Sequence, residues 1–385
     1  MSNAPDPTDA RASRRWLVAA AGLAAAAAIV TVSVVAQRGD DATPAADPES
    51  SSSPSSASPT PTAPTGPTRP AGPSDSPVGI DYLEGTTWVR ADGARVDLAT
   101  AYDGGTVLGD DLIGVHTDAR GRQLFDVVGP DGSVTETVPF LTGLAVNEEH
   151  TTIAYLEPDG DLMTMWDPRT GDEGRVRMAR DLPSDVSPVS VLGGPSCYEA
   201  TPHYGCAVVY NFGDGETPPR SVSSHGIDDE VVFVGDPPLQ VADATADGVL
   251  VVTESYTDLG SCNGVYDPRG ARGPRYDYET CDYFLLDIAP DGAHVAATHA
   301  YLDGPGNGFV AVLDDAGDEV ARLTPQGGVT VEQAWEDDDS VLVTVNDGDG
   351  WTMWRLGVDG SATRVLGPSP AGDDVTPGYR LLGGY

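Results

Sequence analysis

Lysine is absent from the 385-residue chain, so Arg supplies the 21 basic residues that stand against 60 Asp and Glu. The formal net charge at neutral pH is −39. Proteins that bind nucleic acids contact phosphates through clustered Lys and Arg, and a surface of this charge repels a polyanion. The composition therefore excludes a nucleic-acid partner and argues against docking on anionic lipid headgroups.

Motifs for metal binding and catalysis are also lacking. The six His show no H-E-x-x-H spacing, Cys-x-x-Cys is absent, and no Gly-rich phosphate loop precedes a helix. Acidic turns such as residues 337–339 and 347–350 lack the complete calcium-loop spacing, which favours solvated turn carboxylates. We therefore expect no metal, no other cofactor and no enzymatic activity.

Long amphipathic helical patterns are missing, whereas turn residues are abundant. The chain contains 46 Gly and 32 Pro, well above the usual share of these residues. Such a composition argues against a helical bundle and against a parallel α/β barrel.

One long uncharged segment lies near the N-terminus. Residues 16–36 carry no charge, and as a helix they would rise about 31 Å, enough to cross a bilayer core of about 30 Å. Three Arg within residues 1–15 favour a cytoplasmic tail and export of the chain beyond residue 36. We expect a single-pass signal anchor in the cell membrane with an extracytoplasmic C-terminal domain. The alternative is a long signal peptide cleaved after Ala36.

Residues 37–78 have the composition of a linker. Pro, Ser and Thr fill most of the positions from 41 to 78, and aromatic residues are absent there. Such a segment cannot bury a core, so we expect a disordered spacer with local polyproline character.

The four Cys all lie beyond the linker, which agrees with an oxidising compartment. Four Cys allow three pairings. Their spacing favours two disulfides, Cys197–Cys206 and Cys262–Cys281, because each pair brackets a turn-rich stretch.

An internal repeat dominates residues 79–385. Asp-Gly, a strong hairpin signal because the turn requires positive φ, occurs eleven times in the chain. Seven β-rich runs recur, at residues 79–84, 112–117, 152–156, 207–212, 249–255, 294–299 and 341–346. Seven units of about 44 residues, each with about four short strands, predict an all-β fold, a seven-bladed β-propeller.

The C-terminal segment completes this pattern. The first unit lacks an innermost strand, and residues 379–383 are similar to the innermost strands expected at 106–109 and 190–193. We expect the C-terminus to complete the first blade and close the ring, which leaves no open sheet edge.

The Pro-Asp-Gly turns at 130–132, 158–160 and 290–292, together with residues 335–343, resemble blades of the WD40-like and TolB-like propeller families of exported bacterial proteins. The resemblance covers residues 79–385 and is architectural. It implies a protein-interaction or scaffold ectodomain and not a reaction.

A recognition surface is predicted in the fourth and fifth repeats, where Tyr and Arg gather in an otherwise acidic domain. Both residue types are enriched at interface hot spots. The alternative is a pair of disulfide-stapled loops without a partner. The candidate residues are Tyr198, His203, Tyr204, Tyr266, Arg269, Arg272, Arg275, Tyr276 and Tyr278.

These features together predict a membrane-anchored extracytoplasmic propeller that binds a protein, a peptide or a cell-wall polymer without catalysis. The rival class is a propeller-fold enzyme, a hydrolase or lyase acting on glycans. Such an enzyme would need two carboxyl groups facing each other in the central funnel, about 5–10 Å apart.

Overall fold

The computed structural model describes residues 77–166, 174–193, 206–223, 228–229, 237–246, 248–257, 260–268, 275–301, 306–369, 372 and 376–383. The predicted tail, anchor and nearly all of the linker lie outside these residues. Over the described part of the chain, no helix combines the length and the hydropathy that crossing a membrane requires.

The strands form seven four-stranded antiparallel sheets, which we number as blades. Blade 1 contains β28 (Tyr379–Leu381), β1 (Tyr82–Glu84), β2 (Thr87–Val89) and β3 (Arg95–Asp97). Blade 2 contains β4 (Gly104–Leu108), β5 (Asp111–Thr117), β6 (Gln123–Val128) and β7 (Val134–Pro139). Blade 3 contains β8 (Leu144–Val146), β9 (Thr152–Leu156), β10 (Leu162–Trp166) and β11 (Arg175–Ala179). Blade 4 contains β12 (Val186–Leu192), β13 (Ala207–Phe212), β14 (Arg220–Ser223) and β15 (Asp228–Asp229). Blade 5 contains β16 (Gln240–Ala244), β17 (Leu250–Thr257), β18 (Gly260–Asp267) and β19 (Arg275–Thr280). Blade 6 contains β20 (Tyr283–Ile288), β21 (Val295–His299), β22 (Val310–Leu313) and β23 (Glu319–Leu323), and blade 7 contains β24 (Val329–Asp337), β25 (Ser340–Asn346), β26 (Trp351–Gly357) and β27 (Ala362–Ser369).

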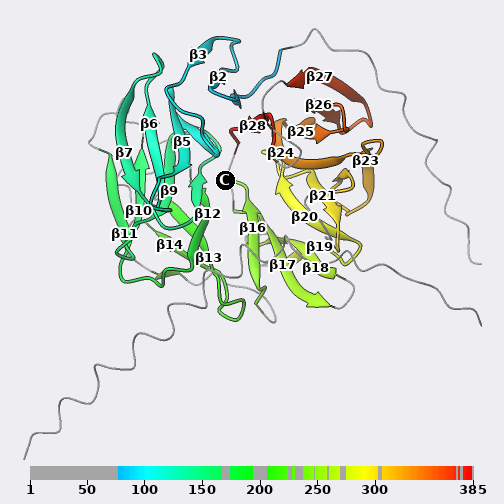
Figure 1. Cartoon of the computed structure of the whole chain (residues 1–385). Coiled ribbons are helices and arrows are strands. Elements are labelled where there is room, and N and C mark those ends of the chain that lie inside the picture. The colour runs from blue at the N-terminus through cyan, green and yellow to red at the C-terminus, as the bar shows by residue number, and fades with distance from the viewer. Residues whose placement is uncertain are drawn as a thin grey trace, which may run out of the picture. The chain divides into compact units, whose positions relative to one another are not determined.

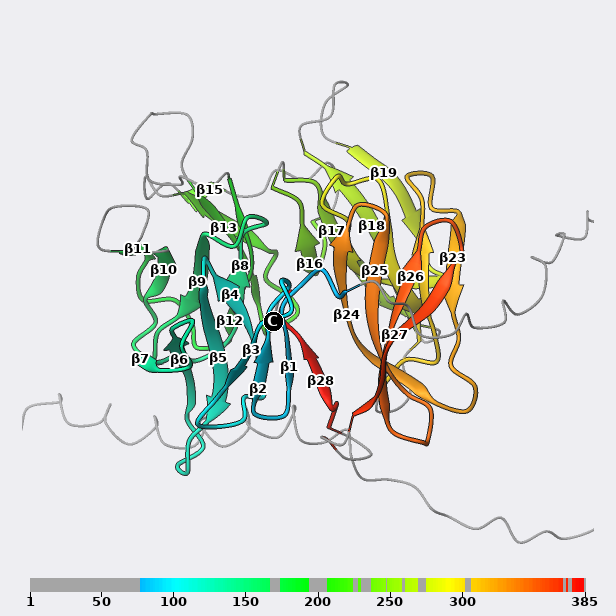
Figure 2. The same cartoon turned by 90° about the horizontal axis from the view of Figure 1, so that it is seen from above.

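The blades surround a common axis (Figure 1), and Figure 2 shows the same ring turned by 90°, with β1 and β28 near its middle. The predicted seven-bladed propeller is therefore confirmed. Each recurring β-rich run of the sequence corresponds to the second strand of a blade. This strand lies between two others, as β9 does with all five of its residues buried, so its apolar pattern is the most continuous.

The C-terminal strand closes the ring as predicted. β28 pairs with β1 in antiparallel register, with Tyr82 opposite Leu381 and Glu84 opposite Tyr379. Tyr82 and Tyr379 also stack edge to face, with ring centroids 6.0 Å apart. The first blade is thus built from both ends of the propeller, and it has the same number of strands as the others.

The hydrophobic core lies between neighbouring blades. Phe125 of blade 2 and Tyr155 of blade 3 are both fully buried, and their rings make an edge-to-face contact with centroids 5.0 Å apart. Blades 7 and 1 share a similar cluster that includes Trp351 and Tyr379. Because every blade packs against two others, the stability of each blade depends on its neighbours.

The Pro-Asp-Gly turns adopt the geometry that their residues require. Gly132, Gly160 and Gly292 have φ values of +82°, +89° and +74°. Each donates its N–H to the carbonyl three residues earlier, at 2.8–3.0 Å. Glycine adopts this conformation without a Cβ clash, so Asp-Gly sets the turns at which the chain reverses.

The structure places Cys262 of β18 and Cys281, which follows β19, in a disulfide, as predicted, with their Cα atoms 4.1 Å apart. Cys206 is also disulfide-bonded. Its predicted partner, Cys197, lies outside the described residues.

Candidate functional site

The innermost strands of all seven blades surround a cavity of about 740 Å³ on the propeller axis. We call this cavity the central channel. Each blade contributes lining residues, among them Leu381, Gly104, Val146, Ser190, Asp243, Asp287 and Glu332, taken in order from blade 1 to blade 7.

Irregularities in the innermost strands expose side chains to the channel. The pairing register shifts within β12, β16, β20 and β24, the innermost strands of four consecutive blades. A bulge adds an unpaired residue and re-aims the side chains beside it. Residues at or beside these shifts, such as Val189, Ala242 and Val331, line the channel.

Carboxylates dominate the charged lining of the channel. Five acidic residues contribute to it, and none of the described lining residues is Arg. The five are Glu148, Asp243, Asp287, Glu332 and Glu336.

Asp243 joins blade 5 to blade 6. One of its carboxylate oxygens accepts the N–H of Ala244 at 2.7 Å, and the other accepts the N–H of Ile288 at 3.0 Å. Burial, followed by the charge of Asp287, raises the pKa of Asp243 to about 7 despite these two bonds. Desolvation of the carboxylate therefore outweighs the donors that stabilise its charge.

Asp287 is the partner of this carboxylate on the next innermost strand. Burial raises the pKa of Asp287 to about 6, although Gln333 donates a hydrogen bond to it. Its backbone carbonyl accepts the indole N–H of Trp335 at 3.3 Å. Since the two carboxylates repel each other, they titrate as a coupled pair.

The two glutamates of β24 are compensated by Arg. Glu332 forms an ion pair with Arg380 and accepts the N–H of Leu381 at 3.0 Å, which ties blade 7 to the closing strand. Glu336 forms an ion pair with Arg355 and accepts the N–H of Gly79. These carboxylates therefore help to close the ring as well as lining the channel.

Two polar side chains that line the channel donate hydrogen bonds to other groups of the protein. The side-chain amide of Asn211 donates to Val241 O at 2.8 Å, and its oxygen accepts the Val241 N–H at 2.9 Å. The hydroxyl of Ser190 donates to Ala244 O at 3.3 Å. These two side chains therefore bond to backbone groups of neighbouring strands.

His150 lines the channel with one unsatisfied ring nitrogen. Burial lowers the pKa of His150. Its Nδ1 atom is buried without a hydrogen-bond partner.

The predicted recognition surface is only partly described. The residues Tyr198, His203, Tyr204, Arg269 and Arg272 lie outside the described residues. In the strand order, β12 and β13 are the first two strands of blade 4, and β18 and β19 are the last two strands of blade 5. First and third strands of antiparallel blades run the same way, so β12 and β18 end on the same side of the ring.

The described members of that surface differ in exposure. Tyr266 is fully buried, with its ring centroid 5.0 Å from that of Tyr276, and burial removes it from any exposed recognition surface. Tyr278 is half-buried against the core of blades 5 and 6. Arg275 is exposed and pairs with Asp277 at 2.8 Å. An exposed role for Arg275 and Tyr276 therefore stays a prediction.

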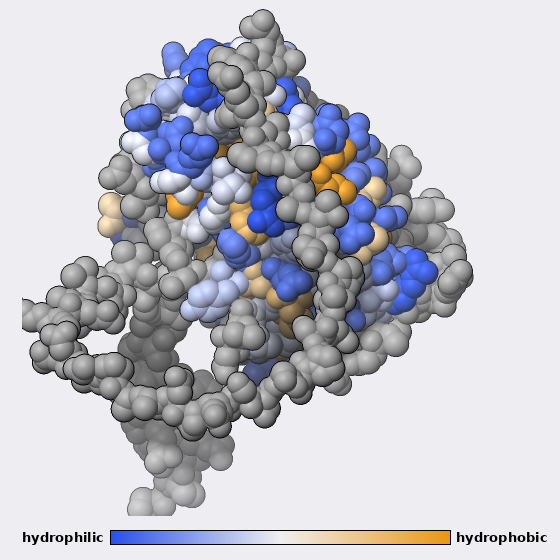
Figure 3. Space-filling view, turned by 90° about the vertical axis from the view of Figure 1, so that its right-hand side faces the viewer, coloured by the Kyte–Doolittle hydropathy of each residue, from blue (hydrophilic) through white to orange (hydrophobic). Residues whose placement is uncertain are grey.

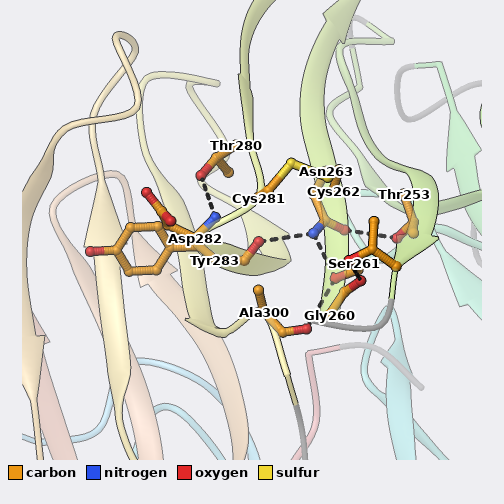
Figure 4. The surroundings of a disulfide bond; sticks show 11 residues. Thr253, Gly260, Ser261, Cys262, Asn263, Thr280, Cys281, Asp282, Tyr283 and Ala300 are labelled. Atoms are coloured by element: carbon orange, nitrogen blue, oxygen red, sulfur yellow. Dashed lines mark hydrogen bonds between the residues drawn. A yellow bond between two sulfur atoms is a disulfide. The ribbon is translucent and has the colours of Figure 1, made fainter.

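A polar junction between blades 5 and 6 lies beside the disulfide of Cys262 and Cys281 (Figure 4). Asn263 donates to Tyr283 O at 2.8 Å and to the hydroxyl of Ser261 at 2.9 Å. The N–H of Ser261 donates to Ala300 O at 3.0 Å. The disulfide holds the outer strand of blade 5 next to this buried network.

One acidic turn has ligand atoms close enough to hold a metal ion. Oxygens of Glu157, Asp159 and Asp161 lie within 4.8 Å of one another in the turn between β9 and β10. Arg177 already forms an ion pair with Asp161, which offsets part of the negative charge. Such turn carboxylates are common without an ion, so the expectation of no metal stays a prediction.

The rest of the visible surface is mainly hydrophilic on the face drawn in Figure 3, with single hydrophobic residues between polar ones. Among the described residues, the large hydrophobic side chains that are exposed are Val134, Tyr256, Tyr301 and Val320.

No protein-family model matches the chain, and no curated protein matches its sequence. Solved structures give distant matches. The β-propeller domain of Cps50 (Swd1) from Myceliophteria thermophila is 13% identical with a TM-score of 0.42, covering 69% of this chain and 87% of that one. BamB from Moraxella catarrhalis is 12% identical with a TM-score of 0.40, covering 76% and 83%. TolB from Acinetobacter baumannii is 16% identical with a TM-score of 0.43, covering 68% and 62%. The assignment of the propeller fold rests on the strand pairing itself.

Proposed function

We propose that the chain is a membrane-anchored extracytoplasmic propeller that binds a protein, peptide or cell-envelope ligand without transforming it. The observation that carries this proposal is the central channel. Its volume of about 740 Å³ falls in the range of about 300–1,000 Å³ that is usual for ligand sites. Seven rigid strands hold its lining, and such support favours binding without a large conformational change.

The membrane anchor is proposed from residues 16–36, and the disulfide between Cys262 and Cys281 supports an oxidising compartment. N-terminal sequencing of the protein purified from membranes tests the anchor. We expect residues 1–36 to be retained. A mature protein that begins after Ala36 would replace the anchor by a cleaved signal peptide.

Binding is tested by incubating the immobilised full-length chain with solubilised cell-envelope fractions and identifying what is retained. Two variants locate the contact. The triple change of Arg269, Arg272 and Arg275 to Ala tests the predicted recognition surface, and Asp287→Asn tests the central channel. We expect at least one variant to lose most of the captured ligand. No retention by the wild-type chain from any fraction contradicts the proposed function.

The channel also favours a second candidate, a glycan-active enzyme. Asp243 and Asp287 line one cavity, and burial together with mutual repulsion holds the pKa of Asp243 well above its usual range, a common feature of catalytic acids. Against this, both oxygens of Asp243 already accept backbone N–H groups. New reducing ends after incubation with envelope glycans, absent in Asp287→Asn, would establish the enzyme.

A further inference from the structure

We infer that the disulfide between Cys262 and Cys281 is a redox-responsive site, which a dithiol reductant opens while the chain stays folded and whose reduction loosens the outermost strand of blade 5. The inference goes beyond the proposed binding function and does not depend on it. It derives from the exposure of the bond, from its place between two blades, and from the contacts that it secures.

The bond is exposed on one side. Cys281 is exposed, whereas Cys262 is partly buried. Cys206, which is also disulfide-bonded, is fully buried. In thiol–disulfide exchange a thiolate has to reach one of the two sulfur atoms, and exposed disulfides are the ones that reductants open most readily. The exposure therefore favours attack at the Sγ atom of Cys281.

Cys281 lies in the short link between two blades. Only residues 281 and 282 separate β19 of blade 5 from β20 of blade 6. Cys262 precedes Asn263 in β18, and Asn263 is paired with Thr280, the last residue of β19. The disulfide therefore continues the strand pairing by one position and fastens the link to β18.

The strand that the disulfide fastens is an edge of its sheet. β19 pairs with β18 alone, and its side chains Arg275, Asp277 and Glu279 are exposed. Tyr278, near the middle of the strand, packs against the core of blades 5 and 6. Segments with many exposed backbone hydrogen bonds and few buried contacts open at a lower free energy than the rest of a fold. Reduction should therefore loosen this edge without unfolding the ring.

Hydrogen bonds around the link carry the effect to the junction between blades 5 and 6 (Figure 4). The N–H of Asp282 donates to the hydroxyl of Thr280 at 3.1 Å, and the side chain of Asn263 donates to Tyr283 O at 2.8 Å. Both bonds depend on the position of the link, so opening of the disulfide weakens them together. Arg275, a predicted recognition residue, begins the same strand.

The exchange is a balanced two-electron transfer. One thiolate of the dithiol attacks Sγ of Cys281 and forms a mixed disulfide, and Cys262 leaves as a thiolate that takes up a proton. The second thiol of the reductant then attacks the reductant's own sulfur in the mixed disulfide and releases Cys281. The dithiol is oxidised to a disulfide, and the chain gains two thiols. The reverse exchange with an oxidised dithiol restores the bond.

The test is incubation of the full-length chain with dithiothreitol under conditions where circular dichroism shows it to be folded, followed by thiol labelling and peptide mass spectrometry. Direct attack gives a reduction rate proportional to the dithiothreitol concentration, whereas reduction that waits for global unfolding has a rate independent of it. We expect Cys262 and Cys281 to become labelled together, at a proportional rate. A concentration-independent rate, or no labelling of the folded chain, would overturn the inference.

Hydrogen exchange of the oxidised and the reduced chain tests the loosening. We expect the amides of β19 and of residues 281–282 to exchange about tenfold faster after reduction, and those of the central strand β9 to be unchanged. The matched control, Cys262→Ser with Cys281→Ser, should exchange like the reduced wild-type chain and should not respond to dithiothreitol in β19. Equal exchange of β19 in oxidised and reduced wild-type chains would contradict the inference.

Discussion

Asp287 shows how a single side chain of the channel makes stability depend on pH. Burial raises the pKa of this carboxyl to about 6 in the folded chain, above the usual value near 3.9 of an unfolded one. The folded state therefore binds the proton more tightly, and this contribution to stability is fully present below about pH 4 and is lost as the pH rises through about 6.

Asp287→Asn removes this dependence. We expect the melting temperature of the variant relative to wild type to increase from pH 4 to pH 8, because the variant forms one buried charge, at Asp243, where the wild-type chain forms two. Melting curves followed by circular dichroism at four pH values measure it. Asp315→Asn, in an exposed turn, should show a constant difference from wild type, and a constant difference for Asp287→Asn would contradict the assignment.

Asn263 tests the buried junction between blades 5 and 6. Asn263→Ala leaves Tyr283 O and the hydroxyls of Ser261 and Thr253 without a partner that each now has. An unsatisfied buried polar group costs about 1–3 kcal/mol, so we expect a loss of at least about 2 kcal/mol in the free energy of unfolding. Denaturant titration measures it, and a loss below about 0.5 kcal/mol would be inconsistent with a buried network.

The innermost strands explain which part of the site the sequence predicts and which part it does not. The second strand of each blade is buried on both faces, so its continuous apolar run marks the blade and leads to the count of seven. An innermost strand contributes between one residue, as in β4, and six residues, as in β24, to the channel. No linear motif joins the residues of different strands.

A signal for the channel is nevertheless present in the sequence. Asp243, Asp287 and Glu332 succeed one another at intervals of 44 and 45 residues, which is one blade each, and all three line the channel. Alignment of the blades by their second strands would place these acids in equivalent strands. The Tyr and Arg cluster is more conspicuous, but composition alone does not separate the buried Tyr266 from residues on a surface.

The disulfide between Cys262 and Cys281 gives a prediction about the strands β18 and β19 that it links. Cys262 in β18 and Cys281 just after β19 are 19 positions apart in the sequence, and a bridge over a segment of this length stabilises by about 3 kcal/mol in the loop-closure account. We expect the double change to Ser to lower the unfolding free energy by about that amount while the rest of the ring stays folded. A variant as stable as wild type in denaturant titration would contradict a structural role for this bond.

At the scale of the whole molecule, closure of the ring gives the separate blades a common axis. β28 is hydrogen-bonded to β1, and Glu332 and Arg380 join it to blade 7. Leu381, Leu382 and Gly383 line the central channel. The C-terminal segment therefore contributes to the fold and to the candidate site together.

Removal of residues 376–385 tests this central claim most directly, with thermal unfolding of the full-length and the shortened chains as the measurement. We predict that the shortened chain loses its cooperative transition or melts at least 10 °C lower, because the edge of β1 and the core shared by blades 7 and 1 become exposed. An unchanged melting temperature would contradict a ring closed by the C-terminal strand.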